Sequence, residues 1–174
     1  VDIGRAAYIH DWTMTERHLI ILVQPWVNEN LRPPVVAGFE WQPQHGFQML
    51  IVDKDDFSYQ RWAQAPARMF FHTGSAWEES DGTIKFDVVL YKEPVLGVGG
   101  GAAEIRGEWS GHDPFYDGIL TQVVIPTSGD AKLVETDIAG EFPQVAPRYR
   151  GKRRQLTALP GGATAARPGT ATAR

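Results

Sequence analysis

The chain has 174 residues, of which 43% are hydrophobic and 22% charged, as in an ordinary soluble globular protein. It has no cysteine, which excludes disulfides and thiolate metal sites. The longest apolar run, Leu19 to Val23, is far too short to cross a bilayer, so a cytoplasmic location is the default expectation.

Charge is unevenly distributed along the chain, whose net charge is −4. All acidic residues precede Pro147, and the part that follows holds only basic charges. A basic end can attract nucleic acid or anionic lipid. Beyond Leu159, however, the composition is limited almost to Ala, Gly, Thr, Pro and Arg, which favours a disordered tail that binds no nucleic acid. We therefore divide the chain into a folded domain over 1–158 and a low-complexity tail over 159–174.

Short strands are expected along most of the domain. Apolar runs and alternating patterns between turn residues predict strands over 19–23, 47–52, 59–63, 68–72, 84–91, 120–125 and 131–136, the last two forming a hairpin. No segment has a clean helical period. Strands of this length and spacing predict an all-β sandwich, barrel or propeller. The Gly-rich stretch 94–118 is typical of a long loop, and it lacks the features of a nucleotide-binding loop.

The candidate chemistry lies in the five histidines, at positions 10, 18, 45, 72 and 112. His10 precedes a strand, and His72 ends the predicted strand 68–72. Their spacing alone does not indicate a metal, because an isolated histidine is more often structural. The other three histidines lie among polar residues, as surface histidines usually do.

Several segments resemble, in consistent order, the motifs of the carotenoid cleavage oxygenases, and together they cover about 9–152. They are Ile9-His10-Asp11-Trp12-x-Met14-Thr15-Glu16; Arg61-Trp62; Phe71-His72-x-x-Ser75-Ala76-x-Glu78-Glu79 with the following strand 84–89; and Glu141-Phe142-Pro143 followed by Pro147-Arg148-Tyr149. Ser75 stands where that family usually has Asn.

The resemblance implies a fold and a metal site. That family folds as a seven-bladed β-propeller with Fe(II) held by four histidines, three of which are hydrogen-bonded by glutamates. His10 would be the second ligand and His72 the third, and Glu141 would pair with His72. The chain would then be a partial propeller of about three blades, with the first and fourth histidines outside it. Glu78 and Glu79 are expected to be structural partners of basic or backbone groups.

The resemblance also implies a function. It predicts a non-haem Fe(II) dioxygenase that cleaves a conjugated C=C bond of a carotenoid or apocarotenoid with O₂, giving two carbonyl products. Cleavage of a stilbenoid is an alternative, and a catalytically inactive propeller fragment is another. The expected partners are a lipophilic polyene or stilbenoid and O₂. Such substrates are compatible with peripheral membrane contact, and the oligomeric state is left open.

Overall fold

The computed structural model of the protein describes residues 2–29, 38–95, 106–108, 117–153 and 157–159. In these ranges the regular structure is almost entirely β-strand, with the short 3-10 helices η2 (Pro43–His45) and η4 (Pro147–Tyr149). No helix among the described residues is long and apolar enough to span a membrane. The expectation of an all-β fold is therefore confirmed.

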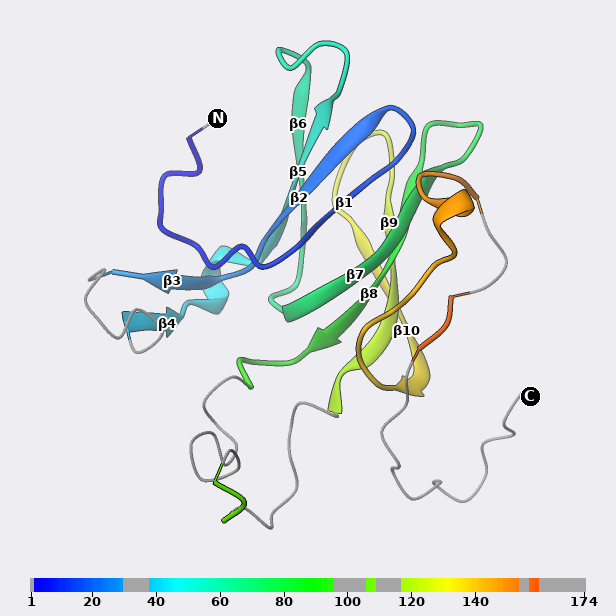
Figure 1. The fold of residues 1–174 in the computed structure, drawn as a ribbon. Helices are drawn as coiled ribbons and strands as arrows, with labels where there is room; N and C mark the ends of the chain where they lie inside the picture. Colours follow the sequence, from blue (N-terminus) through cyan, green and yellow to red (C-terminus); the bar gives the residue numbers. More distant parts are fainter. Residues whose placement is uncertain (1, 30–37, 96–105, 109–116, 154–156, 160–174) are drawn as a thin grey trace.

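The strands form two four-stranded antiparallel sheets and one two-stranded sheet (Figure 1). The first sheet has the order β1-β2-β5-β6 and the second the order β10-β9-β8-β7, and β3 and β4 pair between β2 and β5 in the chain. The strands are β1 (Trp12–Met14), β2 (His18–Val23), β3 (Trp26–Asn28), β4 (Phe39–Trp41), β5 (Phe47–Asp53), β6 (Gln60–Ala65), β7 (Met69–Glu78), β8 (Ile84–Tyr91), β9 (Ile119–Ile125) and β10 (Lys132–Ala139). Four-stranded antiparallel sheets of this kind are the blades of β-propellers.

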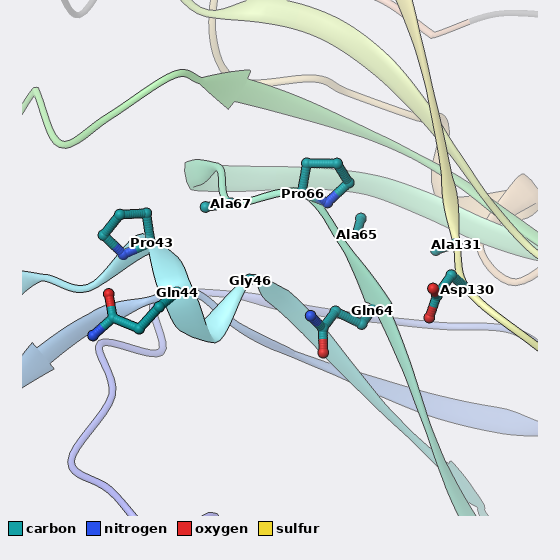
Figure 2. Close-up of a pocket in the computed structure, with 9 residues that line it drawn as sticks. All are labelled: Pro43, Gln44, Gly46, Gln64, Ala65, Pro66, Ala67, Asp130 and Ala131. Atoms are coloured by element: carbon teal, nitrogen blue, oxygen red, sulfur yellow. The ribbon is translucent and has the colours of Figure 1, made fainter.

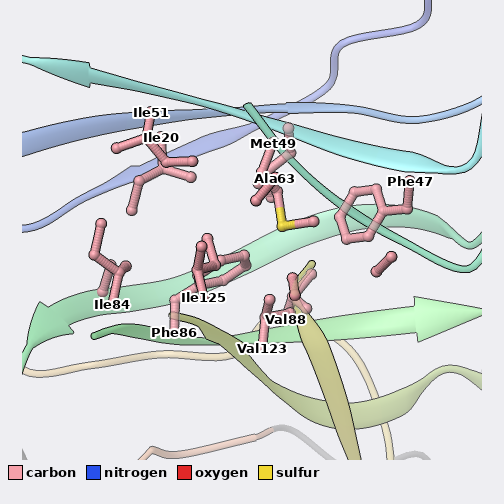
Figure 3. Packing of buried hydrophobic residues seen from close by; sticks show 14 of the residues in the cluster. Ile20, Phe47, Met49, Ile51, Ala63, Ile84, Phe86, Val88, Val123 and Ile125 are labelled. Atoms are coloured by element: carbon pink, nitrogen blue, oxygen red, sulfur yellow. The ribbon is translucent and has the colours of Figure 1, made fainter. Parts of the chain in front are cut away.

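The main hydrophobic core lies between the two four-stranded sheets (Figure 3). Ile20 and Met49 of the first sheet belong to the same buried cluster as Ile84 and Phe86 of the second, and all four are at most 1% exposed. Burial of one such side chain contributes about 1.5–3 kcal/mol. The period-2 alternation in β8 explains why Ile84 and Phe86 point to the same face.

A second, smaller cluster supports the other face of β8. Its buried members are Trp26, Met69, Phe71, Val89 and Tyr91, with Tyr8, Phe39, Trp41, Val95 and Leu159 packed against them. Residues of β3, β7 and β8 thus share one aromatic-rich cluster. Because the second half of β8, from Val88 to Tyr91, is buried on both faces, it fixes the position of β7 beside it.

The edge strands β1 and β7 lie against each other where the two sheets meet (Figure 1). The Thr13 hydroxyl of β1 donates a hydrogen bond of 3.0 Å to the Gly74 carbonyl of β7. The pairing of β7 with β8 shifts register between Phe70 and Thr73, and again between Thr73 and Ala76. Such irregularities re-aim side chains near functional sites.

Each predicted strand overlaps an observed one, and the structure adds β1, β3 and β4, which were not predicted. The expectation that His72 ends its strand is wrong, because β7 continues to Glu78. Thr73, Gly74 and Ser75 do not look like a strand in sequence, and contacts with Asp11 and with Thr13 of β1 hold Thr73 and Gly74 there. The predicted loop over 94–118 and the predicted tail over 159–174 lie for the most part outside the described residues.

Candidate metal centre

Asp11 connects the segment that carries His10 to the strand that carries His72. Its Oδ2 atom accepts hydrogen bonds from the Thr73 backbone N–H at 2.8 Å and from the Thr73 hydroxyl at 2.7 Å. Its other oxygen accepts the Trp12 N–H at 2.8 Å. Asp11, the residue after His10, is therefore hydrogen-bonded to Thr73, the residue after His72.

This connection places the two imidazole rings side by side. The ring centroids of His10 and His72 are 5.2 Å apart, and the planes are nearly perpendicular at 88°. Phe71 lies edge-on to His10 at 5.3 Å. Partial burial of the ring, and then the neighbouring His72, lower the pKa of His10, against smaller raising effects of Asp11 and Glu141. The arrangement thus favours neutral His10, the form that binds metals.

Glu141 is the hydrogen-bond partner of His72. The His72 Nδ1 atom lies 3.0 Å from Glu141 Oε2, and the carboxylate is 2% exposed. Phe142 follows with a φ of 56°, which is uncommon for a residue with a side chain. In this conformation its N–H donates to Glu141 Oε2 at 2.7 Å, and its ring lies 4.4 Å from that of His72.

Tyr8 is the corresponding partner of His10. Its hydroxyl lies 3.0 Å from His10 Nδ1, and the two rings stack at 5.7 Å. Trp26 and Phe39 hold the Tyr8 ring through edge contacts at 4.9 and 5.3 Å. Burial raises the pKa of Tyr8, so the phenol stays protonated and can donate or accept.

The two partners differ in what they impose on the rings. An ionised carboxylate only accepts hydrogen bonds, so Glu141 keeps the proton of His72 on Nδ1 and leaves a lone pair on Nε2. A tyrosine hydroxyl accepts or donates, so Tyr8 is compatible with either tautomer of His10. His72 is therefore held with Nε2 unprotonated, whereas His10 reaches the same state when it donates to Tyr8.

The residues present fit a metal ion. Both rings use Nδ1 for these contacts, so Nε2 is the nitrogen that can bind a metal. Two imidazoles that bind one ion at about 2.1 Å have ring centroids roughly 4.5–5.5 Å apart for bond angles of about 90–120°. The observed 5.2 Å lies in that range. Among the described residues no group of three or more His, Asp, Glu or Cys could hold a metal, so the candidate site in this part of the chain consists of the two imidazoles.

The other charged candidates have structural partners. His18 pairs with Glu78 at 2.7 Å, and the Thr15 hydroxyl donates to the same carboxylate. Glu78 lies six residues beyond His72 in β7, about 20 Å at 3.3 Å per residue, so this pair is separate from the His10 site. Glu79 accepts from Lys85 at 3.0 Å. These contacts agree with the expected structural role of both glutamates.

The motif residue Ser75 and the later Gly151 act in packing around β1 and β7. The Ser75 hydroxyl accepts a 2.8 Å hydrogen bond from the Gly151 N–H. Gly151 has a φ of 77°, and a Cβ there would lie 3.2 Å from the backbone of Thr15 and Glu16. A side chain at this position is therefore disfavoured both by conformation and by space. The small Ser75 joins the segment after Glu141 to β7.

Two cavities of about 330 Å³ lie among the described residues. One borders the site on the side of Asp11 and Thr73, and its lining combines apolar Trp12 and Met14 with polar side chains including Arg150. The other lies between η2, the end of β6 and the turn before β10 (Figure 2). Among its lining residues Asp130 alone is ionisable, so this second cavity is not part of the histidine site.

Comparison with solved structures identifies the architecture. The chain resembles an ACO/RPE65 chimera with a TM-score of 0.72 and 21% identity, over 92% of this chain and 34% of that one. It resembles a mutant of Synechocystis apocarotenoid oxygenase with a TM-score of 0.71 and 22% identity, over 91% of this chain and 33% of that one. It also resembles the lignostilbene dioxygenase of Pseudomonas brassicacearum with a TM-score of 0.66 and 20% identity, over 86% of this chain and 32% of that one. The chain thus spans about a third of the length of these proteins. Its sheets are part of a β-propeller fold, which confirms the predicted partial propeller.

The family follows from the sequence match. The family described as retinal pigment epithelial membrane protein matches residues 1–170. The chain belongs to this family, which confirms the carotenoid cleavage oxygenase resemblance. No curated protein matches it.

The roles of Tyr8 and Tyr91 around the histidines were not predicted from the sequence. Tyr8 stands two residues before His10, a position where a period-2 backbone returns side chains to one face, so a signal was available. Tyr91 lies nineteen positions beyond His72 and reaches the site through the pairing of β8 with β7, which no local motif indicates.

Proposed function

We propose that the protein contributes to a non-haem Fe(II) dioxygenase that cleaves a conjugated C=C bond of a carotenoid or apocarotenoid with O₂, giving two carbonyl products. His10 and His72 would be two of the iron ligands. The observation that carries this proposal is the pair of adjacent imidazoles whose Nδ1 atoms are bonded elsewhere, so that both Nε2 atoms are available. Family membership supports the reaction class.

The residues around the two histidines would position the imidazole rings and keep their metal-facing nitrogens unprotonated. Neutral imidazole suits iron, and Fe(II), when bound, would supply the activation of O₂ that C=C cleavage needs. Asp11 and Thr73 hold the two ligand segments at a fixed separation. Glu141 keeps the metal-facing nitrogen of His72 unprotonated and raises its basicity.

Glu141 is not proposed as an acid or a base. Its carboxylate accepts hydrogen bonds from His72, Phe142 and Tyr91, so its oxygens are already engaged inside the protein. A group in that position orients its neighbours. The reaction proposed here also depends more on metal activation of O₂ than on proton transfer.

The remaining iron ligands would come from outside the described residues. Two histidines alone form an incomplete ligand set, and affinity depends on a filled and oriented set. A chain that supplies only these two would therefore hold iron weakly. An inactive fragment is the second candidate function, and the two-ligand site favours it. Iron content and turnover measured on the purified protein separate the two. Stoichiometric iron with turnover supports the enzyme, whereas the absence of both iron and turnover supports the inactive fragment.

The direct test of the ligand assignment is His72→Ala, with His45→Ala as the matched control. His45 contacts Gln42 at 3.0 Å beside η2 and is not part of the site. In a protein that contains iron, His72→Ala should abolish iron content and cleavage of an apocarotenoid, and His45→Ala should change neither. Wild-type iron stoichiometry in His72→Ala would refute the assignment.

Stilbenoid cleavage is the alternative substrate class, supported by the similarity to lignostilbene dioxygenase. The same ligand pair would serve both substrates. One apocarotenoid aldehyde and one hydroxystilbene, assayed side by side with Fe(II) and O₂, distinguish them. Turnover of the stilbene alone would replace the carotenoid proposal.

A further inference from the structure

Tyr91 bonds the carboxylate oxygen that His72 does not use. Its hydroxyl donates to Glu141 Oε1 at 2.8 Å, while His72 Nδ1 contacts Oε2 at 3.0 Å. A carboxylate held by both oxygens cannot rotate without breaking a bond. We infer that Tyr91 is a positioning residue that fixes the plane of Glu141 and, through it, the orientation of the His72 ring. This inference rests on the proposed ligand role of His72.

The surroundings of Tyr91 fit such a role. The residue is 3% exposed at the end of β8, opposite Met69 in the ladder with β7. Its ring packs edge-on against Phe71 at 5.8 Å, next to His72 in sequence. A buried hydroxyl requires a hydrogen-bond partner, and this one is directed at the buried carboxylate. Aromatic packing holds the ring while its hydroxyl holds Glu141.

Gly118 makes room for this tyrosine. A Cβ at Gly118 would lie 2.7 Å from Tyr91 Cζ, 2.9 Å from its hydroxyl oxygen and 2.4 Å from Val89 Cγ1. The Gly118 carbonyl also accepts a 3.0 Å hydrogen bond from the N–H of Gly140, the residue before Glu141. Gly118 therefore contacts the tyrosine on one side and is bonded to the glutamate segment on the other.

The effect of the tyrosine should be smaller than that of the glutamate. Loss of a group that orients a metal-binding histidine typically costs about 10–100-fold in metal affinity. Tyr91 acts one residue further out, so we expect about 10-fold, the low end of that range. The expected cause is a mobile Glu141 carboxylate that no longer keeps the His72 ring in one orientation.

The test is a double-mutant cycle of Tyr91→Phe and Glu141→Gln, read by Co(II) affinity of the protein. Tyr91→Phe keeps the ring and removes the hydroxyl. If the tyrosine acts through the glutamate, Tyr91→Phe weakens Co(II) binding about 10-fold in the wild type and by less than about 2-fold in the Glu141→Gln background. Tyr59→Phe, at a 70% exposed position, is the control and should leave affinity unchanged.

A second readout does not depend on metal. In metal-free protein, the ¹⁵N shifts of the His72 ring should show one tautomer in the wild type and a mixture in Tyr91→Phe. Unchanged shifts and affinity in Tyr91→Phe, or losses that multiply in the double variant, would overturn the inference. If Tyr91→Phe does not fold, Tyr91→Met provides the same readouts, because it also removes the hydroxyl and is smaller than tyrosine. If His72→Ala binds Co(II) like the wild type, the proposed function fails, and the ¹⁵N readout still tests the effect of Tyr91 on His72.

Discussion

Asp11 accepts two hydrogen bonds from Thr73, and these bonds hold the two histidine segments together across the junction of two sheets. Asp11 immediately precedes the edge strand β1, and Thr73 lies within the edge strand β7, so the contact connects the start of one sheet's edge to the edge of the other sheet. The spacing of the candidate metal ligands therefore depends on a side chain that binds no metal.

Thr73→Val should weaken this connection. The substitution keeps the shape of the side chain and removes the hydroxyl donor to Asp11, so we expect a loss of about 1–2 kcal/mol in the free energy of unfolding, between the ranges for neutral and charged partners. Urea denaturation measures it. Thr127→Val, at an exposed turn position, is the control and should stay within about 0.5 kcal/mol of the wild type. Equal losses in both variants would show that the Asp11 bond contributes nothing specific.

The two histidines should differ in tautomer when no metal is bound. Glu141 only accepts, so His72 should be a single tautomer with its proton on Nδ1, whereas Tyr8 accepts or donates, so His10 should populate both forms. The ¹⁵N shifts of the rings at pH 8 report this directly. Tyr8→Phe should change the His10 signals and leave those of His72 in place. A mixture at His72 as large as that at His10 would contradict the asymmetry.

Stability should fall in acid through His10. Burial of the ring and the adjacent His72 lower its folded-state pKa, so below about pH 6.5 the unfolded chain binds a proton more readily than the folded protein. The contribution of neutral His10 to the free energy of unfolding is fully present above that pH and is lost as the pH falls towards the folded-state pKa of His10. Between pH 8 and pH 5, metal-free wild type should lose more unfolding free energy than His10→Gln. Parallel pH profiles would show that His10 is not responsible.

Much of the fold was predictable because the long strands bury one face. Strand 84–91 was predicted with its observed bounds, since Ile84, Phe86 and Val88 alternate with the less buried Lys85 and Asp87. The strands β1, β3 and β4 were missed, because three residues are too few to show a period of two. The continuation of β7 was missed because tertiary contacts with Asp11 and with β1, not apolar alternation, keep Thr73 and Gly74 in the strand.

The site was predictable only in part. His10, His72 and Glu141 were found because they stand in motifs of a known family. The bond of Asp11 to Thr73 and that of Tyr91 to Glu141 depend on how strands from distant parts of the chain are placed, which local sequence does not reveal.

Conservative substitutions in the shared core test whether the two sheets unfold together. Ile20→Val in the first sheet and Ile84→Val in the second should each cost about 0.5–1.5 kcal/mol, because each removes one buried methylene. A single unfolding transition should remain in both. Ile138→Val makes the same change at a 49% exposed position and should cost less than about 0.5 kcal/mol. Two separate transitions in either core variant would show that the sheets do not share one core.

The central claim is that His10 and His72 bind the same metal ion. Anomalous diffraction from crystals of the protein grown with Co(II) tests it most directly. We expect one anomalous peak at roughly 2.0–2.2 Å from Nε2 of both histidines, a typical metal–histidine distance. A peak bound to only one of the two rings, or to neither, would contradict it.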